Sequence, residues 1–256
     1  MLRIRSYLTR SQLNLSVIMQ QTSRAAMEPL SFQQSIAAAG WAVTEPTVDS
    51  AEIARLRECV AAHARSGRGG ARNLLDDPHV ATLATSPALR HFAEAVLGAG
   101  CFAVRALFFD KTPDANWKVI WHQDLTVAAR ERVEVPGYGP WTDKGGVPHV
   151  QPPVSILEDM LAIRAHLDPC GDDNGPVRVL DGTHRLGRLS SHQIDEPRAK
   201  RSESVCLAAE GALLAFRPLL LHVSSPATRP AHRRVIHIEY AARELAPPLV
   251  WHRRVA

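Results

Sequence analysis

The sequence predicts an all-β core with flanking helices, folded as an antiparallel barrel or jelly roll. Short apolar runs follow one another after Gly100, and clusters of Gly, Pro, Asp and Asn separate them. No helical pattern alternates with these runs, as β-α-β units would require. The 256 residues, 45% of them hydrophobic, can bury a substantial core within one domain.

Helical patterns are confined to the part of the chain before Gly100. Apolar residues spaced three and four apart indicate helices there, and residues 40–43 are expected to form a short strand. Capping residues and glycines mark the helix ends. The expected helices begin at Ser31, at Ser50 and at Pro87, and the last runs to Leu97 before Gly98.

The apolar runs after Gly100 are expected to be strands. One long segment between them, residues 130–153, is expected to be a loop that covers the active site, because long loops in compact domains are usually lids or binding elements. The expected strands are residues 102–109, 118–121, 160–167, 177–180, 211–216 and 235–240.

The N-terminal residues 1–26 differ in composition from the rest. They are rich in Arg, Ser and Gln and contain no acidic residue, as a mitochondrial targeting segment would. A disordered tail or upstream extension before Met27 explains the same composition and is the favoured interpretation. Residues 27–256 are then expected to form a single domain.

The cysteines and charges limit the cellular setting and the partners. Cysteines at 59, 101, 170 and 206 form no CxxC pair, which argues against a zinc ribbon or a redox dithiol and favours a reduced, cytoplasmic protein. No apolar stretch is long enough to span a membrane. The net charge of +4 is modest and only 5% of residues are aromatic, so no nucleic-acid partner is expected. The oligomeric state stays open.

The motif Trp121-His122-Gln123-Asp124 is the strongest functional signal. Residues i and i+2 of a strand project to the same face, so His122 and Asp124 could bind one metal ion. His222, 98 residues after Asp124, would complete a facial two-histidine, one-carboxylate set that leaves open positions on Fe(II). An HxD triplet also occurs by chance among twelve histidines, but Arg233 follows His222 by eleven residues and could grip a carboxylate.

Two segments carry a resemblance to a known family. Residues 109–124, from Phe109-Asp110-Lys111-Thr112-Pro113 to the HxD motif, resemble a first-ligand region, and residues 174–185 resemble an NGPL-R-V-PGSHR segment. Asp181 replaces the usual proline of that segment, and His184 is expected to order the loop. From about Met27 to Tyr240 the chain resembles the phytanoyl-CoA dioxygenase family of Fe(II)- and 2-oxoglutarate-dependent oxygenases.

The resemblance implies a cupin-like double-stranded β-helix and assigns roles to single residues. His122, Asp124 and His222 would bind Fe(II), while Arg233 and Ser224 would hold the distal carboxylate of 2-oxoglutarate. O2 would be the second cosubstrate, with succinate and CO2 as products. Relatives that halogenate have lost the carboxylate ligand, so Asp124 favours hydroxylation of a small molecule. Further cosubstrate contacts are expected at Arg105, Phe109 and Lys111.

Candidate substrate contacts lie on a strand and beside the metal motif. Arg164 and His166 alternate with Ala165 and should point the same way; a buried arginine there needs either a carboxylate partner or an anionic ligand. An acidic substrate would suit Arg105, Arg164 and Arg188. The other expected substrate contacts are Gln123 and Trp141.

Two alternatives stay open. A non-catalytic cupin-like protein could use the same triad to hold a metal for structure or sensing, although it would not need Arg233. The same cofactors could also drive desaturation, epimerisation or cyclisation in a biosynthetic pathway, because the metal ligands are the same for these outcomes.

Overall fold

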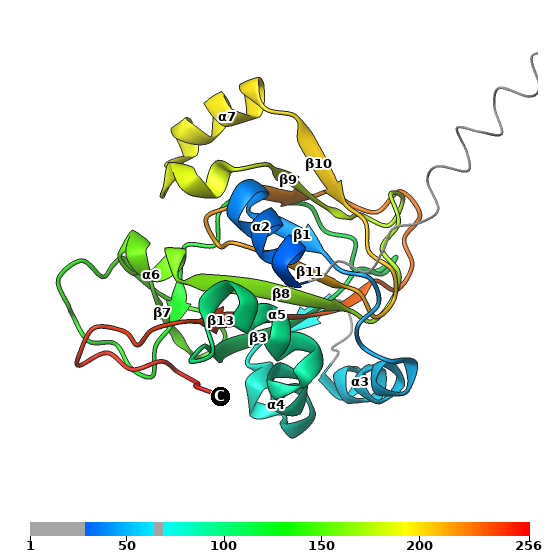
Figure 1. Ribbon diagram of the computed structural model, residues 1–256, viewed down its shortest axis with the longest axis horizontal. Coiled ribbons are helices and arrows are strands. Elements are labelled where there is room, and N and C mark those ends of the chain that lie inside the picture. Colours follow the sequence, from blue (N-terminus) through cyan, green and yellow to red (C-terminus); the bar gives the residue numbers. More distant parts are fainter. Residues whose placement is uncertain (1–28, 64–68) are drawn as a thin grey trace, which may run out of the picture.

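Two antiparallel sheets form the core of the computed structural model, which describes residues 29–63 and 69–256 (Figure 1). The major sheet has the strand order β1-β11-β8-β13-β3-β2, and the minor sheet has the order β10-β9-β12-β4. The major-sheet strands are β1 (Trp41–Val43), β2 (Gly70–Ala71), β3 (Phe102–Asp110), β8 (Met160–His166), β11 (Leu213–Phe216) and β13 (Arg234–Ala241). The minor-sheet strands are β4 (Val119–His122), β9 (Val177–Leu180), β10 (Glu203–Cys206) and β12 (His222–Ser224).

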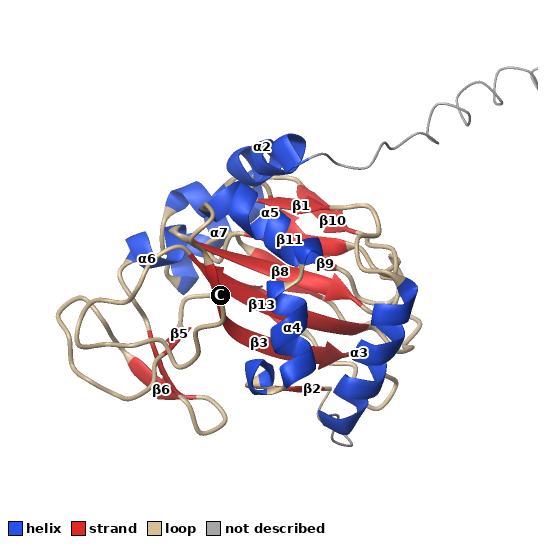
Figure 2. Ribbon diagram, turned by 60° about the horizontal axis from the view of Figure 1, so that its bottom comes forward, coloured by secondary structure: helices blue, strands red, loops and turns tan. Residues whose placement is uncertain are grey.

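Helices cover the outer face of the major sheet (Figure 2). Alternation along the strands turns Ile163 of β8 and Ile236 of β13 outward, where they pack with Leu56 and Leu89 of the helices in the largest apolar cluster. The helices are α2 (Pro29–Ala39), α3 (Ser50–His63), α4 (Pro78–Thr85), α5 (Pro87–Leu97), α6 (Val154–Glu158) and α7 (Asp195–Lys200). Single 3-10 turns occur at Leu74–Asp76, Thr183–Leu186 and Ser191–Ile194.

The predicted all-β core with flanking helices is confirmed, and the predicted helices correspond to α2, α3 and α5. The last of these ends as expected at Gly98, whose φ of 90° is a conformation that residues with a side chain rarely adopt. Short helices such as α4 were not predicted. There Asp77 caps the helix by accepting a hydrogen bond from the His79 amide at 2.9 Å.

The inner face of the major sheet is unusually polar. On β13 the residues that alternate with the outward isoleucines are His237 and Glu239, and both are buried. Their neighbours in register are Arg164 of β8, opposite His237, and Arg105 of β3, opposite Glu239. This face lies toward the minor sheet, so the buried charges line the space between the two sheets.

The expectation that residues 130–153 form a loop is partly wrong. The segment contains β6 (Trp141–Asp143) and β7 (Pro148–Val150), which join β5 (Val127–Ala128) in a third antiparallel sheet. A turn with positive φ at Gly145 and Gly146 connects β6 to β7, and the Gly146 amide donates to Asp143 Oδ1 at 2.9 Å. The apolar residues of segment 130–153 are too few and too often interrupted for hydrophobic periodicity to predict this hairpin.

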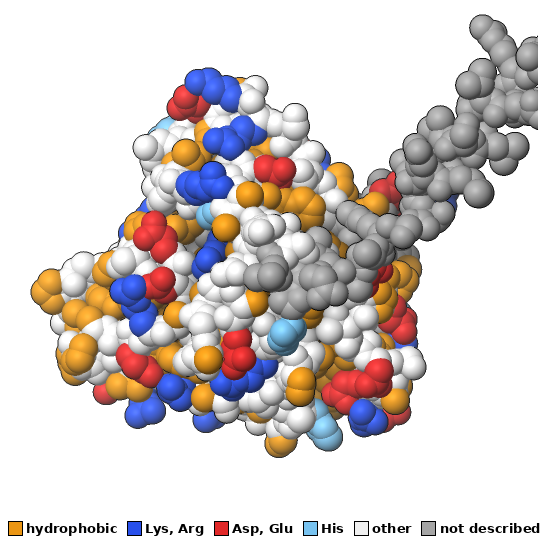
Figure 3. Space-filling model, in the orientation of Figure 1, with side chains coloured by type: hydrophobic (Ala, Val, Ile, Leu, Met, Phe, Trp, Pro, Cys, Tyr) orange, Lys and Arg blue, Asp and Glu red, His pale blue; other side chains and the backbone are white. Residues whose placement is uncertain are grey.

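The surface carries charges of both signs. In the view of Figure 3, Lys and Arg side chains are interspersed with Asp and Glu, and on α7 some of them form exposed pairs such as Glu196 with Lys200 at 2.7 Å. None of the helices in the described ranges is both long enough and apolar enough to cross a bilayer. The predicted N-terminal tail, residues 1–26, lies outside the described residues.

Candidate metal centre

Pairing between β4 and β12 brings together two histidines that are far apart in the sequence. His222 is the first residue of β12 and lies opposite His122, the last residue of β4. Their ring centroids are 4.1 Å apart. His222 is buried at 3% exposure, because β12 also pairs with β9 on its other side, whereas His122 is half-buried.

Asp124 completes the group from just beyond the end of β4. One of its carboxylate oxygens lies 3.7 Å from His122 Nε2, and the other lies 3.7 Å from His222 Nε2. The Asp124 amide donates to the Pro218 carbonyl at 2.8 Å, which fixes this segment beside the turn before β12. The expectation that His122 and Asp124 share one strand face is therefore wrong in detail, since the strand has ended at His122, but the two side chains still converge.

Backbone hydrogen bonds orient both imidazole rings. His122 Nδ1 lies 2.8 Å from the Ile120 carbonyl, and His222 Nδ1 lies 2.9 Å from the Leu220 carbonyl. Because a carbonyl only accepts, each Nδ1 carries the proton and each Nε2 keeps its lone pair. Both Nε2 atoms face Asp124, and the three ligand atoms lie within 4.8 Å of one another. This donor set fits a divalent transition metal.

The protonation states also suit metal binding. Burial lowers the pKa of His222 to about 3, so this ring is neutral at physiological pH. Burial alone would raise the pKa of Asp124, but His222 and His122 together outweigh that effect and hold it well below its usual value. Asp124 is therefore ionised. A neutral His222 ring and an ionised Asp124 carboxylate are forms that bind a cation.

A second polar group lies near Ser224, two residues after His222. Lys111 is fully buried, and its Nζ donates to Ser224 Oγ at 2.9 Å and to the Ser225 carbonyl. Ser224 Oγ donates to the Gly175 carbonyl at 3.0 Å, and Arg233 Nη1 donates to the same carbonyl. Within the described ranges neither cation has a carboxylate partner, and burial followed by the charge of Arg233 lowers the pKa of Lys111 to about 8. Two buried cations beside a hydroxyl fit a carboxylate.

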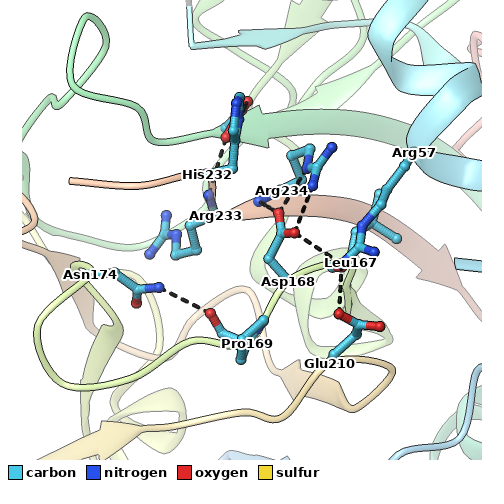
Figure 4. Close-up of polar contacts among 10 residues, drawn as sticks. Arg57, Leu167, Asp168, Pro169, Asn174, Glu210, His232, Arg233 and Arg234 are labelled. Atoms are coloured by element: carbon cyan, nitrogen blue, oxygen red, sulfur yellow. Dashed lines mark hydrogen bonds and ion pairs between the residues drawn. The ribbon is translucent and has the colours of Figure 1, made fainter. Parts of the chain in front are cut away.

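Contacts on both sides fix the backbone of Arg233 (Figure 4). The Arg233 amide donates to Asp110 Oδ1 at 3.2 Å, and His232 Nδ1 lies 2.8 Å from Asp110 Oδ2. Arg234 binds Asp168 through Nε at 2.8 Å and Nη2 at 2.7 Å. In Figure 4 Arg234 reaches Asp168, whereas the Arg233 side chain extends away from it. These contacts leave the Arg233 guanidinium directed into the space between the sheets.

One cavity joins the metal ligands to Arg233 and Ser224. Its volume is about 200 Å³, and its walls include residues from both sheets. A larger cleft of about 690 Å³ lies beside it, and the two share Leu107, Phe109 and Trp117 in their walls. Of the segment 130–153, Gly145 lines the outer cleft. Predicted site residues in the walls of the inner cavity are Arg105, Phe109, His122, Asp124, Arg164, His222, Ser224 and Arg233.

The structure places three predicted substrate contacts away from this cavity. Gln123 donates to the carbonyls of Gly187 at 2.8 Å and Leu219 at 2.7 Å, and its Oε1 accepts from the Leu189 amide at 2.8 Å. It therefore ties three backbone segments together. His166 and Trp141 likewise do not line the cavity: His166 is buried with neither ring nitrogen hydrogen-bonded, and Trp141 packs against the apolar cluster beneath the third sheet.

Two functional candidates were missed in the sequence. His237 lines the cavity, and Glu239 forms a buried ion pair with Arg105. Arg105, an expected cosubstrate contact, thus lines the cavity with its charge neutralised by Glu239. The sequence contains a signal for both residues, because His237 and Glu239 alternate with isoleucine in an otherwise apolar strand.

Another cluster of potential ligands lies on the helical side. Cys59, His63 and Asp77 lie within metal-binding distance of one another. His63 Nε2 is 2.8 Å from Asp77 Oδ2, and hydrogen bonding between Cys59 and Asp77 contributes, after burial, to raising the pKa of the thiol to about 11. A protonated thiol and a direct His-Asp hydrogen bond describe a capping network rather than a preformed metal site.

Comparison with known proteins supports the fold and shows the family. The model of the phytanoyl-CoA dioxygenase family matches residues 36–235. No curated protein sequence matches the chain significantly. AviO1 from Streptomyces viridochromogenes Tue57 is 20% identical with a TM-score of 0.64, over 87% of this chain and 99% of AviO1.

Two further solved structures contain ligands. EctD from S. alaskensis, with 2-oxoglutarate and 5-hydroxyectoine, is 16% identical with a TM-score of 0.64, over 87% of this chain and 79% of EctD. The epimerase SnoN, in complex with Fe³⁺, alpha ketoglutarate and nogalamycin RO, is 14% identical with a TM-score of 0.63, over 83% of both chains. These similarities confirm the predicted cupin-like jelly roll, here with two open, facing sheets.

Proposed function

Because this chain belongs to the phytanoyl-CoA dioxygenase family, we propose that it is an Fe(II)- and 2-oxoglutarate-dependent oxygenase that hydroxylates a small molecule. One observation carries the proposal. A single cavity of about 200 Å³ joins a His-Asp-His donor set to a buried arginine and serine that suit a carboxylate. A metal centre alone would explain only the first half of this arrangement.

The two histidines and the aspartate would bind Fe(II) from one side. His122, Asp124 and His222 approach from one side, with both Nε2 lone pairs free and the carboxylate ionised. Such a facial set leaves coordination positions for other ligands on the cavity side. Leu107, Phe109 and Val177 add apolar walls that limit the access of water.

The second group would hold 2-oxoglutarate by its distal carboxylate. Arg233 supplies a planar guanidinium whose backbone is fastened to Asp110, and Ser224 supplies a hydroxyl. Lys111 adds a positive charge through its contact with Ser224. The keto acid end of the same molecule would then face the metal ligands.

When bound, Fe(II) with 2-oxoglutarate and O2 supplies oxidation of a substrate C–H bond, with succinate and CO2 as coproducts. The protein residues provide geometry and charge. His122 and His222 keep the metal face fixed through their Nδ1 hydrogen bonds to the backbone, and Arg233 sets the direction of the cosubstrate. The outer cleft of about 690 Å³ offers the room that a substrate needs beside the filled inner cavity.

Hydroxylation is the outcome that the metal site supports best. Asp124 occupies the carboxylate position, which a halogenating site would leave free for a halide. Similar folds are found both in a structure that contains 5-hydroxyectoine and in an epimerase. The product must therefore be identified by analysis of the reaction mixture once a substrate is in hand.

Anaerobic titration with Fe(II) and 2-oxoglutarate tests the proposal directly. Chelation of the metal by the keto acid gives a visible charge-transfer band, which is expected for the wild type. His222→Ala should abolish the band, and Arg233→Ala should weaken it by raising the 2-oxoglutarate concentration needed. Arg198→Ala, on the exposed surface of α7, is the matched control and should behave as wild type.

Two results would contradict the proposal. Tight Fe(II) binding without the band would indicate a structural or sensing metal site in the same jelly roll. A band that survives in His222→Ala with wild-type intensity would mean that the metal binds elsewhere.

A further inference from the structure

A chain of polar side chains crosses the floor of the cavity. Arg105 Nη2 donates to Glu239 Oε1, and the same oxygen lies 3.4 Å from His237 Nε2. On the other side of the ring, Arg164 Nε donates to His237 Nδ1 at 3.0 Å. The order Arg105, Glu239, His237, Arg164 follows the register of β3, β13 and β8.

The hydrogen bonds determine the charge states of these four side chains. An arginine N–H can only donate, so His237 Nδ1 accepts and the ring proton lies on Nε2, toward Glu239. His237 is therefore neutral. Arg105 and Glu239 neutralise each other. Arg164 keeps its positive charge and forms no ion pair with any of the described residues.

Arg164 shares the cavity with the Asp124 carboxylate, which acts on it at a distance and is committed to the proposed metal. Among the described residues it forms no ion pair, and Nε is its only nitrogen with a protein acceptor. Its guanidinium lies 4.9 Å from the ring centroid of Phe216 and 5.7 Å from that of Phe109. The aromatic rings and His237 hold the guanidinium in place, while the side chain forms part of the cavity wall with His122, Asp124 and His222.

The net charge of the proposed cofactors can be balanced without Arg164. Fe(II) with Asp124 and doubly negative 2-oxoglutarate leaves one negative charge, which Arg233 neutralises at the distal carboxylate. Lys111 lies at that same end through Ser224. Arg164 remains at the metal end, and a half-buried guanidinium without an ion-pair partner is stabilised when an anion joins it.

We propose that Arg164 binds a carboxylate or a similar anionic oxygen group held beside the metal centre. This inference rests on the proposed function. The group has two sources with one chemistry: the metal-side carboxylate of 2-oxoglutarate, or an acidic group of the substrate. Either would receive charge-assisted hydrogen bonds from the planar fork of Arg164, which is presented to the cavity by His237 and two aromatic rings.

Binding measurements on the full chain with Fe(II) under anaerobic conditions test the assignment. The variants are Arg164→Gln and Arg164→Lys, with Arg198→Gln as the control, because Arg198 lies on the exposed surface of α7. One arm titrates 2-oxoglutarate and, separately, succinate, which lacks the keto acid end. The other arm adds acetate, benzoate or inorganic phosphate to the protein loaded with 2-oxoglutarate and follows shifts of the charge-transfer band.

Each source predicts a different pattern. If Arg164 binds the cosubstrate, Arg164→Gln weakens 2-oxoglutarate binding by about 10- to 100-fold and leaves succinate binding unchanged. If it binds the substrate, 2-oxoglutarate binding is unchanged, but the band shifts caused by one or more of the added anions are lost. Arg164→Lys keeps the positive charge but lacks the planar guanidinium, so its affinity should lie between those of the wild type and Arg164→Gln. It also provides a result if Arg164→Gln does not fold.

Other outcomes overturn the assignment. Unchanged binding of 2-oxoglutarate together with unchanged responses to all three anions would show that Arg164 binds neither source. An equal loss for 2-oxoglutarate and succinate would indicate damage at the Arg233 end. Failure of the wild type to form the band would instead contradict the proposed function, so the two failures are distinguishable.

Discussion

His122 and His222 are direct cross-strand neighbours, and the Nδ1 atom of each lies within hydrogen-bonding distance of the carbonyl two residues before it. The two rings therefore use the same local geometry on antiparallel strands. The second residue back is Ile120 in one case and Leu220 in the other. Backbone carbonyls, rather than a network of side chains, hold the two imidazole rings in place.

Loss of either imidazole should remove the metal. We expect His122→Gln and His222→Gln to lower Fe(II) affinity by more than about 100-fold, which exceeds the usual effect of losing a hydrogen-bond partner of a ligand. His192→Gln, on an exposed turn, is the control. Isothermal titration with Fe(II) under anaerobic conditions measures the effect. Wild-type affinity in both ligand variants would rule out this triad.

The affinity for 2-oxoglutarate should depend on the charge of Lys111. Burial lowers the pKa of this side chain to about 8, so the charged form is lost as the pH rises through that value. Because a carboxylate favours the charged form, we expect 2-oxoglutarate binding to weaken by up to about tenfold per pH unit above pH 8. Lys111→Met should bind more weakly at pH 7 and show no such pH dependence. A parallel pH profile in both proteins would remove Lys111 from the carboxylate site.

Gln123 should contribute to stability rather than to substrate binding. Replacement by Leu leaves the Gly187 and Leu219 carbonyls and the Leu189 amide without their partner. We expect Gln123→Leu to lower the free energy of unfolding by about 2–4 kcal/mol, since an unpaired buried group such as the Leu219 carbonyl costs about 1–3 kcal/mol and the two part-buried groups cost less. Urea denaturation of the metal-free protein measures this change. A stable variant with a specific defect in substrate affinity would instead support the original assignment to the substrate.

His166 should make the protein sensitive to acid. Burial lowers its pKa to about 3, so between pH 6.5 and 3 the unfolded chain binds a proton that the folded chain does not. This contribution to stability is complete above pH 6.5 and is lost as the pH falls, by about 1.4 kcal/mol per unit.

His166→Leu removes that sensitivity and two unpaired buried nitrogens. We expect it to be neutral or stabilising by about 1–3 kcal/mol at pH 7 and to unfold at lower pH than wild type. Thermal melts from pH 4 to 7 provide the comparison. Marked destabilisation at pH 7, or weaker 2-oxoglutarate binding, would show that the ring has a partner or a ligand role.

Periodicity and turn residues were enough to predict the long elements of the fold. Strands β3, β8 and β13 carry apolar residues on the helix-covered face, which produces the apolar runs seen in the sequence. The hairpin of β6 and β7 and the short α4 were not predictable. Each depends on a few residues, such as Gly145 and Asp77, whose effect is local and leaves no periodic pattern.

The candidate site was predictable where the chemistry is encoded by residue type and spacing. The structure brings together His122, Asp124 and His222, with Arg233 in the same cavity. It could not be predicted that Glu239 neutralises Arg105, because cross-strand partners depend on register and not on sequence distance. For the same reason the sequence does not distinguish Arg105 from Arg164, although Arg105 pairs with Glu239 and Arg164 forms no ion pair within the described part of the chain.

Strand β12 sets the distance between two parts of the proposed site. It presents the proposed metal ligand His222 and the proposed carboxylate contact Ser224 two residues apart, and the rise of an extended strand sets that interval at roughly 6.7 Å. A keto acid that spans both points must have the matching number of carbons. Oxaloacetate is one methylene shorter than 2-oxoglutarate and 2-oxoadipate one longer, so neither should engage both ends at once. A three-residue strand would thus select the carbon count of the cosubstrate.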